Sequence, residues 1–161
     1  MRKINELQGD SRIWIYQSSR VLGEQEEQIL TEKMHAFIDV WSSHGQTMDA
    51  SGEIFHHRFL IIAADEKKAT ASGCGIDKSV NFVKRMGEEL NVDFFNRTLV
   101  LFKEKGEMKE LPLNVFWAMR KAGNITDSTI VFDNTIQKLA ELEKNWEVPF
   151  AESWHAQMWG R

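Results

Sequence analysis

The sequence predicts an α+β fold whose core has the ferredoxin-like order β-α-β-β-α-β. Segments with the two-residue period of strands and the 3.6-residue period of helices follow one another in that order between about residues 10 and 104. Two of the strands, 12–17 and 59–64, carry apolar residues on both alternating faces. They are the first and third strands in order, which lie in the middle of a ferredoxin-like sheet. The residue patterns and the topology therefore agree.

The first half of this core begins with the strand 12–17, which places two isoleucines on one face and Trp14 and Tyr16 on the other. After Gly23 the apolar residues recur at helical spacing up to Trp41, with three glutamates at the start, where the helix dipole favours negative charge. We expect this helix to end near the pair His44-Gly45. We expect Trp14 and Tyr16 to be core residues that lie under the C-terminal segment.

The second half of the core begins with a more polar strand, 48–57, and continues with the apolar run from Phe59 to Ala64. A loop of small residues, 69–75, leads into an amphipathic helix that ends near Asn91, a residue that tolerates the left-handed cap conformation. Residues 97–102 form the last predicted strand of the core.

Residues 105–161 are predicted to extend this core with helices and a cover rich in tryptophan. Pro112 and Gly123 mark the start and end of a short helix, a strand follows near 129–132, and 135–144 has a helical pattern. A ferredoxin-like sheet has both helices on one face, so this extension would cover the other face. We expect a single domain, 1–161, since no linker or repeat interrupts the chain.

Composition excludes several classes of function. The net charge is −4 and the pI is near 5.8, which argues against binding to nucleic acid or to an anionic membrane. The first residues lack the apolar centre of a signal peptide, and no stretch approaches the length of a membrane helix. Cys74 is the only cysteine, so no intrachain disulfide forms. We expect a cytoplasmic protein.

Three segments, 12–17, 72–79 and 145–155, resemble an uncharacterised bacterial protein family whose members often carry the label "ABC transporter ATPase". The resemblance spans nearly the whole chain and implies no established activity. The label itself conflicts with the residues, because a Walker A loop would need glycines at Ser72 and Asp77 before Lys78-Ser79. An acidic side chain beside the phosphate-binding lysine would repel the ligand. We therefore reject the ATPase interpretation.

The loop 72–79 is the candidate site, and it has two functional interpretations besides a structural one. Backbone N–H groups at the start of the following helix could bind a small anion; the candidate ligand residues are Ser72, Gly73, Gly75, Lys78 and Ser79. Alternatively, Cys74 is a nucleophile or redox sensor, since a helix start favours the thiolate. The residue type favours the structural interpretation, in which Cys74 is a small buried packing residue. The choice depends on whether Ser72 or Asp77 caps the helix.

The five histidines predict no metal site. His56 and His57 are adjacent, so in an extended strand they point to opposite faces and cannot bind one ion together. His44, His56 or His57 could approach Cys74 as a base, with Asp65 orienting the ring, but the sequence alone does not show this. We expect no metal and no cofactor.

The sequence therefore favours a non-catalytic binding domain for a small anionic ligand or a protein partner at the loop 72–79. A thiol-dependent enzyme or redox sensor that uses Cys74 is the alternative. The tryptophan-rich end offers a further surface, Trp154 and Trp159, for a homodimer or a protein partner, because tryptophan is enriched at interfaces.

Overall fold

A computed structural model describes residues 2–159 of the chain. These residues divide into two compact units, an N-terminal unit (2–96 with Gln137–Leu139) and a C-terminal unit (Arg97–Ile136 with 140–159). Both units contain helices and strands, which confirms the α+β class. The boundary after Asn96 precedes the end of the predicted core at about residue 104. The expectation of a single domain stays a prediction.

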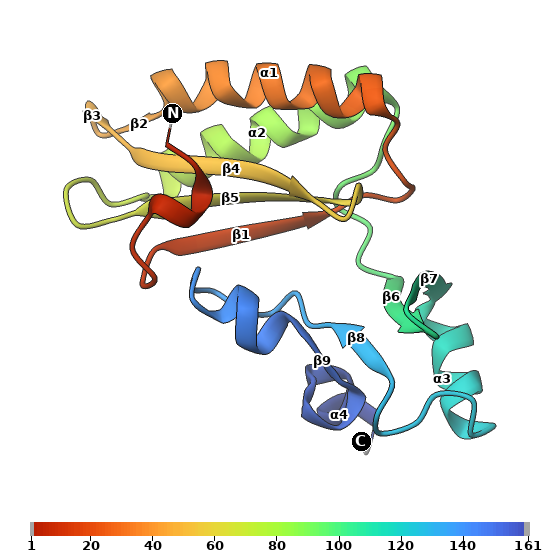
Figure 1. Ribbon diagram of the computed structural model, residues 1–161. Helices are drawn as coiled ribbons and strands as arrows, with labels where there is room; N and C mark the ends of the chain where they lie inside the picture. The colour runs from red at the N-terminus through yellow and green to blue at the C-terminus, as the bar shows by residue number, and fades with distance from the viewer. Residues whose placement is uncertain (1, 160–161) are drawn as a thin grey trace. The chain divides into compact units, whose positions relative to one another are not determined.

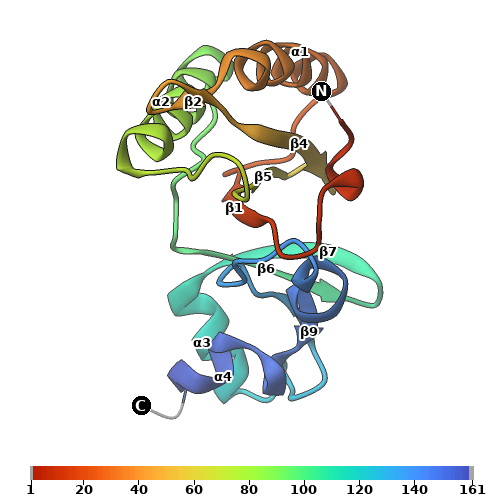
Figure 2. The same ribbon diagram turned by 90° about the vertical axis from the view of Figure 1, so that its left-hand side faces the viewer.

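The N-terminal unit is a sheet with two long helices on one of its faces (Figures 1 and 2). Its elements are η1 (Ile4–Glu6), β1 (Arg12–Gln17), α1 (Glu24–Val40), β2 (Ser42–Ser43), β3 (Gln46–Thr47), β4 (Asp49–Phe55), β5 (Phe59–Asp65) and α2 (Gly73–Leu90). The strand order is β1-β5-β4, and all neighbours are antiparallel. The central strand β5 thus pairs along its whole length with both other strands. At Ile62, for example, its partners are Trp14 of β1 and Gly52 of β4.

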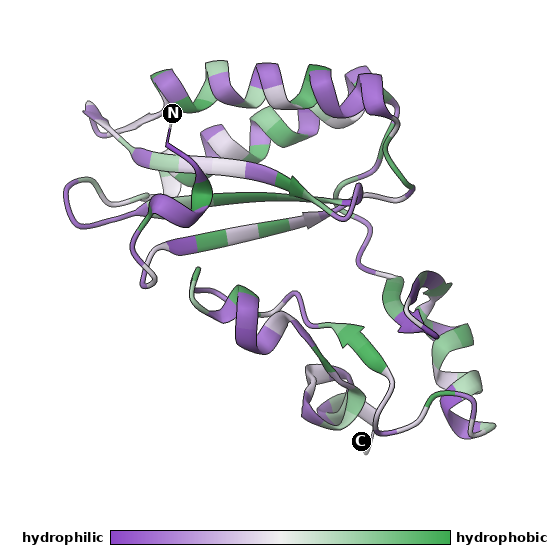
Figure 3. Cartoon of the chain, viewed as in Figure 1, coloured by the Kyte–Doolittle hydropathy of each residue, from purple (hydrophilic) through white to green (hydrophobic). Residues whose placement is uncertain are grey.

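The core of this unit lies between β5 and the two helices. Every residue of β5 is buried, as the apolar run Phe59 to Ala64 predicts, and Asp65 at its end is buried as well. Most of the strand has the colour of hydrophobic residues in Figure 3. Leu60, Ile62 and Ala64 belong to the cluster that contains the buried residues of α1 and α2. Since a strand alternates its faces, Phe59 and Ile61 lie on the opposite face, where they are also fully buried.

Trp14 and Tyr16 lie on the helix-covered face of the sheet, which corrects the prediction that the C-terminal segment covers them. Trp14 packs edge-on against Trp41 at the end of α1, with ring centroids 6.0 Å apart, and Tyr16 belongs to the cluster formed with α1 and α2. The alternation along the strand was predicted correctly, but it does not say which face the helices cover. Both residues are nevertheless part of the packed interior, Tyr16 buried and Trp14 half-buried.

The strand order does not confirm the ferredoxin-like topology. The predicted fourth strand, β6 (Leu99–Glu104), pairs with β7 (Glu107–Pro112) and β8 (Ile130–Phe132) in the C-terminal unit. Lys105 and Gly106 both have positive φ and form the tight turn between β6 and β7. Pairing of β6 with β7 across so short a turn has a small entropy cost of loop closure. Pairing of β6 with β1 would close a much longer loop and cost more. The free edge of β1 lies instead beside residues 137–139, through the hydrogen bonds of Ile13 N to Gln137 O and Leu139 N to Ser11 O.

The connection from α1 to β4 also differs from the expectation. Helix α1 ends at Val40, and the backbone of Trp41 is extended. His44 and Gly45, with φ of 51° and 78°, form the turn of the short β2–β3 hairpin rather than a helix cap. Two consecutive left-handed residues suit both structures, so the sequence pair does not distinguish them.

The C-terminal unit contains a mixed set of strands and short helices around its own core. Its elements are β6, β7, α3 (Leu113–Lys121), β8, η2 (Leu142–Trp146), β9 (Glu147–Pro149), η3 (Phe150–Glu152) and α4 (Trp154–Trp159). The strand order is β7-β6-β8-β9, so the strand near Phe132 lies between β6 and β9. The predicted helix 135–144 is wrong. Residues 137–139 lie beside β1, and the π-helical turn η2 begins only at Leu142.

In the C-terminal unit, a buried polar group fixes the last helix. His155 is 3% exposed, and its Nδ1 lies 3.2 Å from the hydroxyl of Ser153, which itself donates to the carbonyl of Phe150. Burial lowers the pKa of His155 to about 4, although the nearby carboxylate of Asp133 acts in the opposite direction. The imidazole is therefore neutral in the folded chain at pH 7.

No helix of residues 2–159 combines the length and the apolar composition that crossing a membrane would require.

We predict that Gly87→Ala in α2 destabilises the N-terminal unit by about 1–3 kcal/mol. Alanine normally stabilises a helix interior relative to glycine, but a Cβ at Gly87 would lie 2.6 Å from the backbone oxygen of Val92. Gly73→Ala is the matched control, since its Cβ would meet nothing within 4 Å. Urea unfolding of both variants measures the difference, and equal stability would contradict the close approach of Val92.

We predict that the C-terminal unit loses stability as the pH falls from about 6.5 to about 4. Over this range the unfolded chain binds a proton at His155 and the folded chain does not, so protons favour unfolding. The loss reaches about 3 kcal/mol at pH 4, at about 1.4 kcal/mol per pH unit. Unfolding of wild type and His155→Asn, compared at each pH, isolates this contribution from that of the carboxylates. His44→Asn, which replaces an exposed histidine in a turn of the N-terminal unit, controls for the loss of a histidine elsewhere in the chain.

Candidate functional site

The loop 72–79 forms the start of helix α2, and Ser72 is its N-cap. Of the two cap positions that the sequence left open, the structure therefore has the earlier one, and Cys74 lies in the first helical turn. The side chain of Cys74 is exposed. It is thus not the buried packing residue that the sequence also allowed.

The start of α2 is packed against β2, the short strand that follows α1. The hydroxyls of Ser72 and Ser43 are 2.8 Å apart, and the indole Nε1 of Trp41 donates to the carbonyl of Gly75 at 2.9 Å. A Cβ at Gly75 would lie 2.9 Å from the Ser43 hydroxyl, so the close approach depends on glycine there. These contacts fix the loop from the side of α1.

The same contacts leave the helix start without a hydrogen bond from its N-cap side chain. The Ser72 hydroxyl makes no hydrogen bond to a first-turn amide, because Ser43 is its partner. Within residues 2–159, the N–H groups of Gly73, Cys74 and Gly75 consequently have no hydrogen-bond acceptor. Unpaired first-turn amides and the positive end of the helix dipole together attract anions.

The other two predicted ligand residues differ in their availability. Lys78 is exposed, and its Nζ donates to the carbonyl of Ser42 at 3.1 Å, next to the Ser43–Ser72 contact. Ser79 is buried and donates to the carbonyl of Ile76 at 2.7 Å. Burial raises the pKa of the Tyr16 phenol, and the hydroxyl of Ser79 acts in the opposite direction. The structure thus gathers Ser72, Gly73 and Lys78 at one end of α2 but directs Ser79 into the core.

None of the predicted base residues forms a hydrogen bond with Cys74 in the described chain. Asp65, the proposed orienting residue, accepts the backbone N–H of Lys67 at 3.0 Å. His57 instead pairs with Glu27 of α1: its Nδ1 lies 3.0 and 3.1 Å from the two carboxylate oxygens. The geometry therefore supplies an exposed thiol at a helix start but no base hydrogen-bonded to it.

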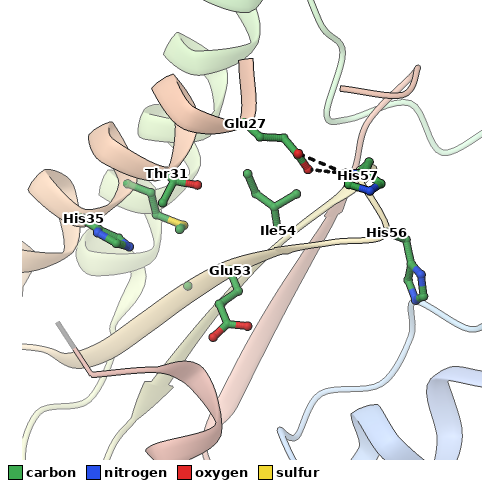
Figure 4. Close-up of a pocket in the computed structure, with 9 residues that line it drawn as sticks. Glu27, Thr31, His35, Glu53, Ile54, His56 and His57 are labelled. Atoms are coloured by element: carbon green, nitrogen blue, oxygen red, sulfur yellow. Dashed lines mark hydrogen bonds and ion pairs between the residues drawn. The ribbon is translucent and has the colours of Figure 1, made fainter. Parts of the chain in front are cut away.

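The sequence analysis missed a groove between α1 and the edge strand β4. It has a volume of about 380 Å³. Its lining consists of Glu27, Thr31, Met34, His35, Gly52, Glu53, Ile54, His56 and His57. Figure 4 shows Glu27, Thr31 and His35 along one side of α1 with Ile54 facing them from β4. Their spacing of four residues along one helix face is the signal that could have identified this polar stripe.

The two adjacent histidines at the end of this groove are in a turn, not in an extended strand as predicted. His56 and His57 have φ of 53° and 57°, a left-handed conformation that is uncommon for residues other than glycine. Figure 4 shows His57 directed toward Glu27 and His56 turned away from it. Among residues 2–159, no group of three or more histidine, cysteine, aspartate or glutamate side chains is placed to hold a metal ion.

The two tryptophans predicted as a partner surface have different surroundings. Trp154 is half-buried and stacks on the ring of His155 at 4.2 Å, so it contributes to the C-terminal unit itself. Trp159 is 36% exposed, and its ring centroid lies 5.4 Å from that of Trp117 in α3. Part of the Trp159 ring is therefore accessible to solvent.

Comparison with known proteins adds no relative to this description. No protein-family model, no curated protein and no solved structure matches the chain. The start of α2 and the groove between α1 and β4 are the two candidate sites of the N-terminal unit.

Proposed function

We propose that the N-terminal unit is a non-catalytic binding domain for a small anionic ligand, which binds at the start of helix α2. The observation that supports this proposal most directly is that the N-cap side chain, Ser72, forms no hydrogen bond with the first turn of the helix. Ser72 is of the residue type that normally accepts a first-turn N–H, but its hydroxyl is paired with Ser43. An anion that accepts from Gly73, Cys74 and Gly75 would take the place of that cap.

Charge around the helix start supports an anion rather than a cation. The first turn of α2 contains no acidic residue, and the ammonium group of Lys78 lies next to it at Ser42. Gly73 has open space where a side chain would be, so a ligand can approach the backbone closely. The exposed acid Asp77 stands where a Walker A loop would have glycine, which favours a monoanion or a small phosphate over a nucleotide.

Thiol chemistry at Cys74 is the second candidate function, and the exposure of the side chain favours it. A reducing compartment such as the cytoplasm, which we propose as the protein's location, would keep this single cysteine as a free thiol. The same amides that would bind an anion would also stabilise a thiolate. Both functions therefore use one place in the fold, and a competition experiment separates them.

We predict that inorganic phosphate shifts the amide resonances of Gly73, Cys74 and Gly75 when it is titrated at constant ionic strength. Lys78→Gln should weaken the affinity by about two- to fivefold, the usual effect of one exposed charge. Lys84→Gln removes the same charge from the same helix three residues before Gly87, and should leave the affinity unchanged. The proposal is wrong if these amides do not respond, or if both variants weaken binding equally.

We predict that iodoacetamide alkylates Cys74 in the folded protein without denaturant, because the sulfur is accessible to solvent. Phosphate should slow this reaction, and Lys78→Gln should reduce the protection. A rate more than about tenfold above that of an unstructured cysteine peptide, with no protection by phosphate, would favour the thiol function instead. Mass spectrometry measures the rate, and each modification is assignable because the chain has one cysteine.

A further inference from the structure

The groove between α1 and β4 has a composition opposite in charge to the start of α2. Of the described residues, those that line it include two glutamates and three histidines but no lysine or arginine. Its volume of about 380 Å³ lies in the range of sites for small organic ligands. A ligand with a negative charge would find no permanent cation here, whereas a positively charged ligand would find carboxylates.

Glu27 is the carboxylate best placed to receive such a ligand. Its side chain is 23% exposed, so it is partly withdrawn from water but accessible from the groove. His57 Nδ1 is hydrogen-bonded to the two oxygens, which fixes the orientation of the carboxylate without using all of its lone pairs. A partly desolvated, oriented carboxylate binds an ammonium group more strongly than one on the open surface.

The remaining lining suits the carbon chain of an amine. Ile54 is half-buried and provides apolar surface to the groove, whereas Met34 is fully buried. The hydroxyl of Thr31 lies one helical turn beyond Glu27 (Figure 4). Glu53 is at the edge of the groove and points away from α1 (Figure 4), where its carboxylate accepts the backbone N–H of Ile4 at 3.4 Å and does not block the site. A partly buried carboxylate beside an apolar side chain suits an alkyl cation, because the charged group and the carbon chain each have a matching neighbour.

We propose that this groove binds a small organic cation, an alkyl ammonium or guanidinium, with the charged group on Glu27 and the carbon chain along Ile54. The site lies in the same unit as the start of α2 but shares no residue with it. Its occupancy is therefore independent of the anion proposed there.

The test uses agmatine as the cationic probe and 1,5-pentanediol as a neutral molecule of similar length. Calorimetric titration of the full chain at constant ionic strength should show binding of agmatine and none of the diol. Glu27→Gln should lower the affinity for agmatine at least tenfold. Glu32→Gln, an exposed residue of α1 outside the groove, removes the same charge and should change the affinity less than twofold.

Amide resonances of the wild-type protein provide a readout that does not depend on any variant folding. Agmatine should shift residues of the groove, Thr31 and Ile54 among them, and should leave Gly73 and Cys74 unaffected. Absence of binding at millimolar agmatine, or an equal effect of Glu27→Gln and Glu32→Gln, would overturn the proposal. Lys78→Gln, which tests the anion site, should not alter agmatine binding, so the two proposals fail separately.

Discussion

The complete burial of β5 is the constraint on which the N-terminal unit depends. All seven of its residues are buried, and the strand pairs on both edges, with β1 and β4. Burial of each large side chain in such a strand contributes about 2 kcal/mol. Because one face packs against α1 and α2, both helices are held in place over the sheet, and with them the start of α2 and the groove beside α1.

Each of the two candidate sites is a consequence of how a neighbouring element packs. At the start of α2, the contact of Ser43 with Ser72 and the absence of a side chain at Gly75 bring β2 close to the helix, and the first-turn amides lose their usual cap. In the groove, Gly52 lets Met34 approach the sheet, since a Cβ there would lie 2.5 Å from the Met34 sulfur. In both places a missing Cβ sets the shape of the site.

Local patterns predicted the elements of the N-terminal unit well, because period and capping are properties of neighbouring residues. The strand 12–17, the burial of β5 and the left-handed cap at Asn91 were all predicted from such patterns. The fourth predicted strand, β6, was assigned to the wrong sheet, because its residue pattern predicts a strand but not its partner. The tight turn at Lys105-Gly106 favours pairing with β7. The groove was not predicted because its lining comes from both α1 and β4, and the pattern of each element alone does not show how the two pack together.

The β4–β5 turn connects the backbone conformation of the N-terminal unit to one side of the groove. His56 and His57 are consecutive left-handed residues, and this conformation costs about 1 kcal/mol or more for a residue with a Cβ. Glycine or asparagine would form the same turn with less strain. The turn contains histidine nonetheless, and the imidazole of His57 is the group that orients Glu27. Left-handed residues also form two other hairpin turns, at His44 and at Lys105, so the conformation itself follows from the fold. What distinguishes the β4–β5 turn is that the imidazole of His57 is hydrogen-bonded to a carboxylate that lines the groove.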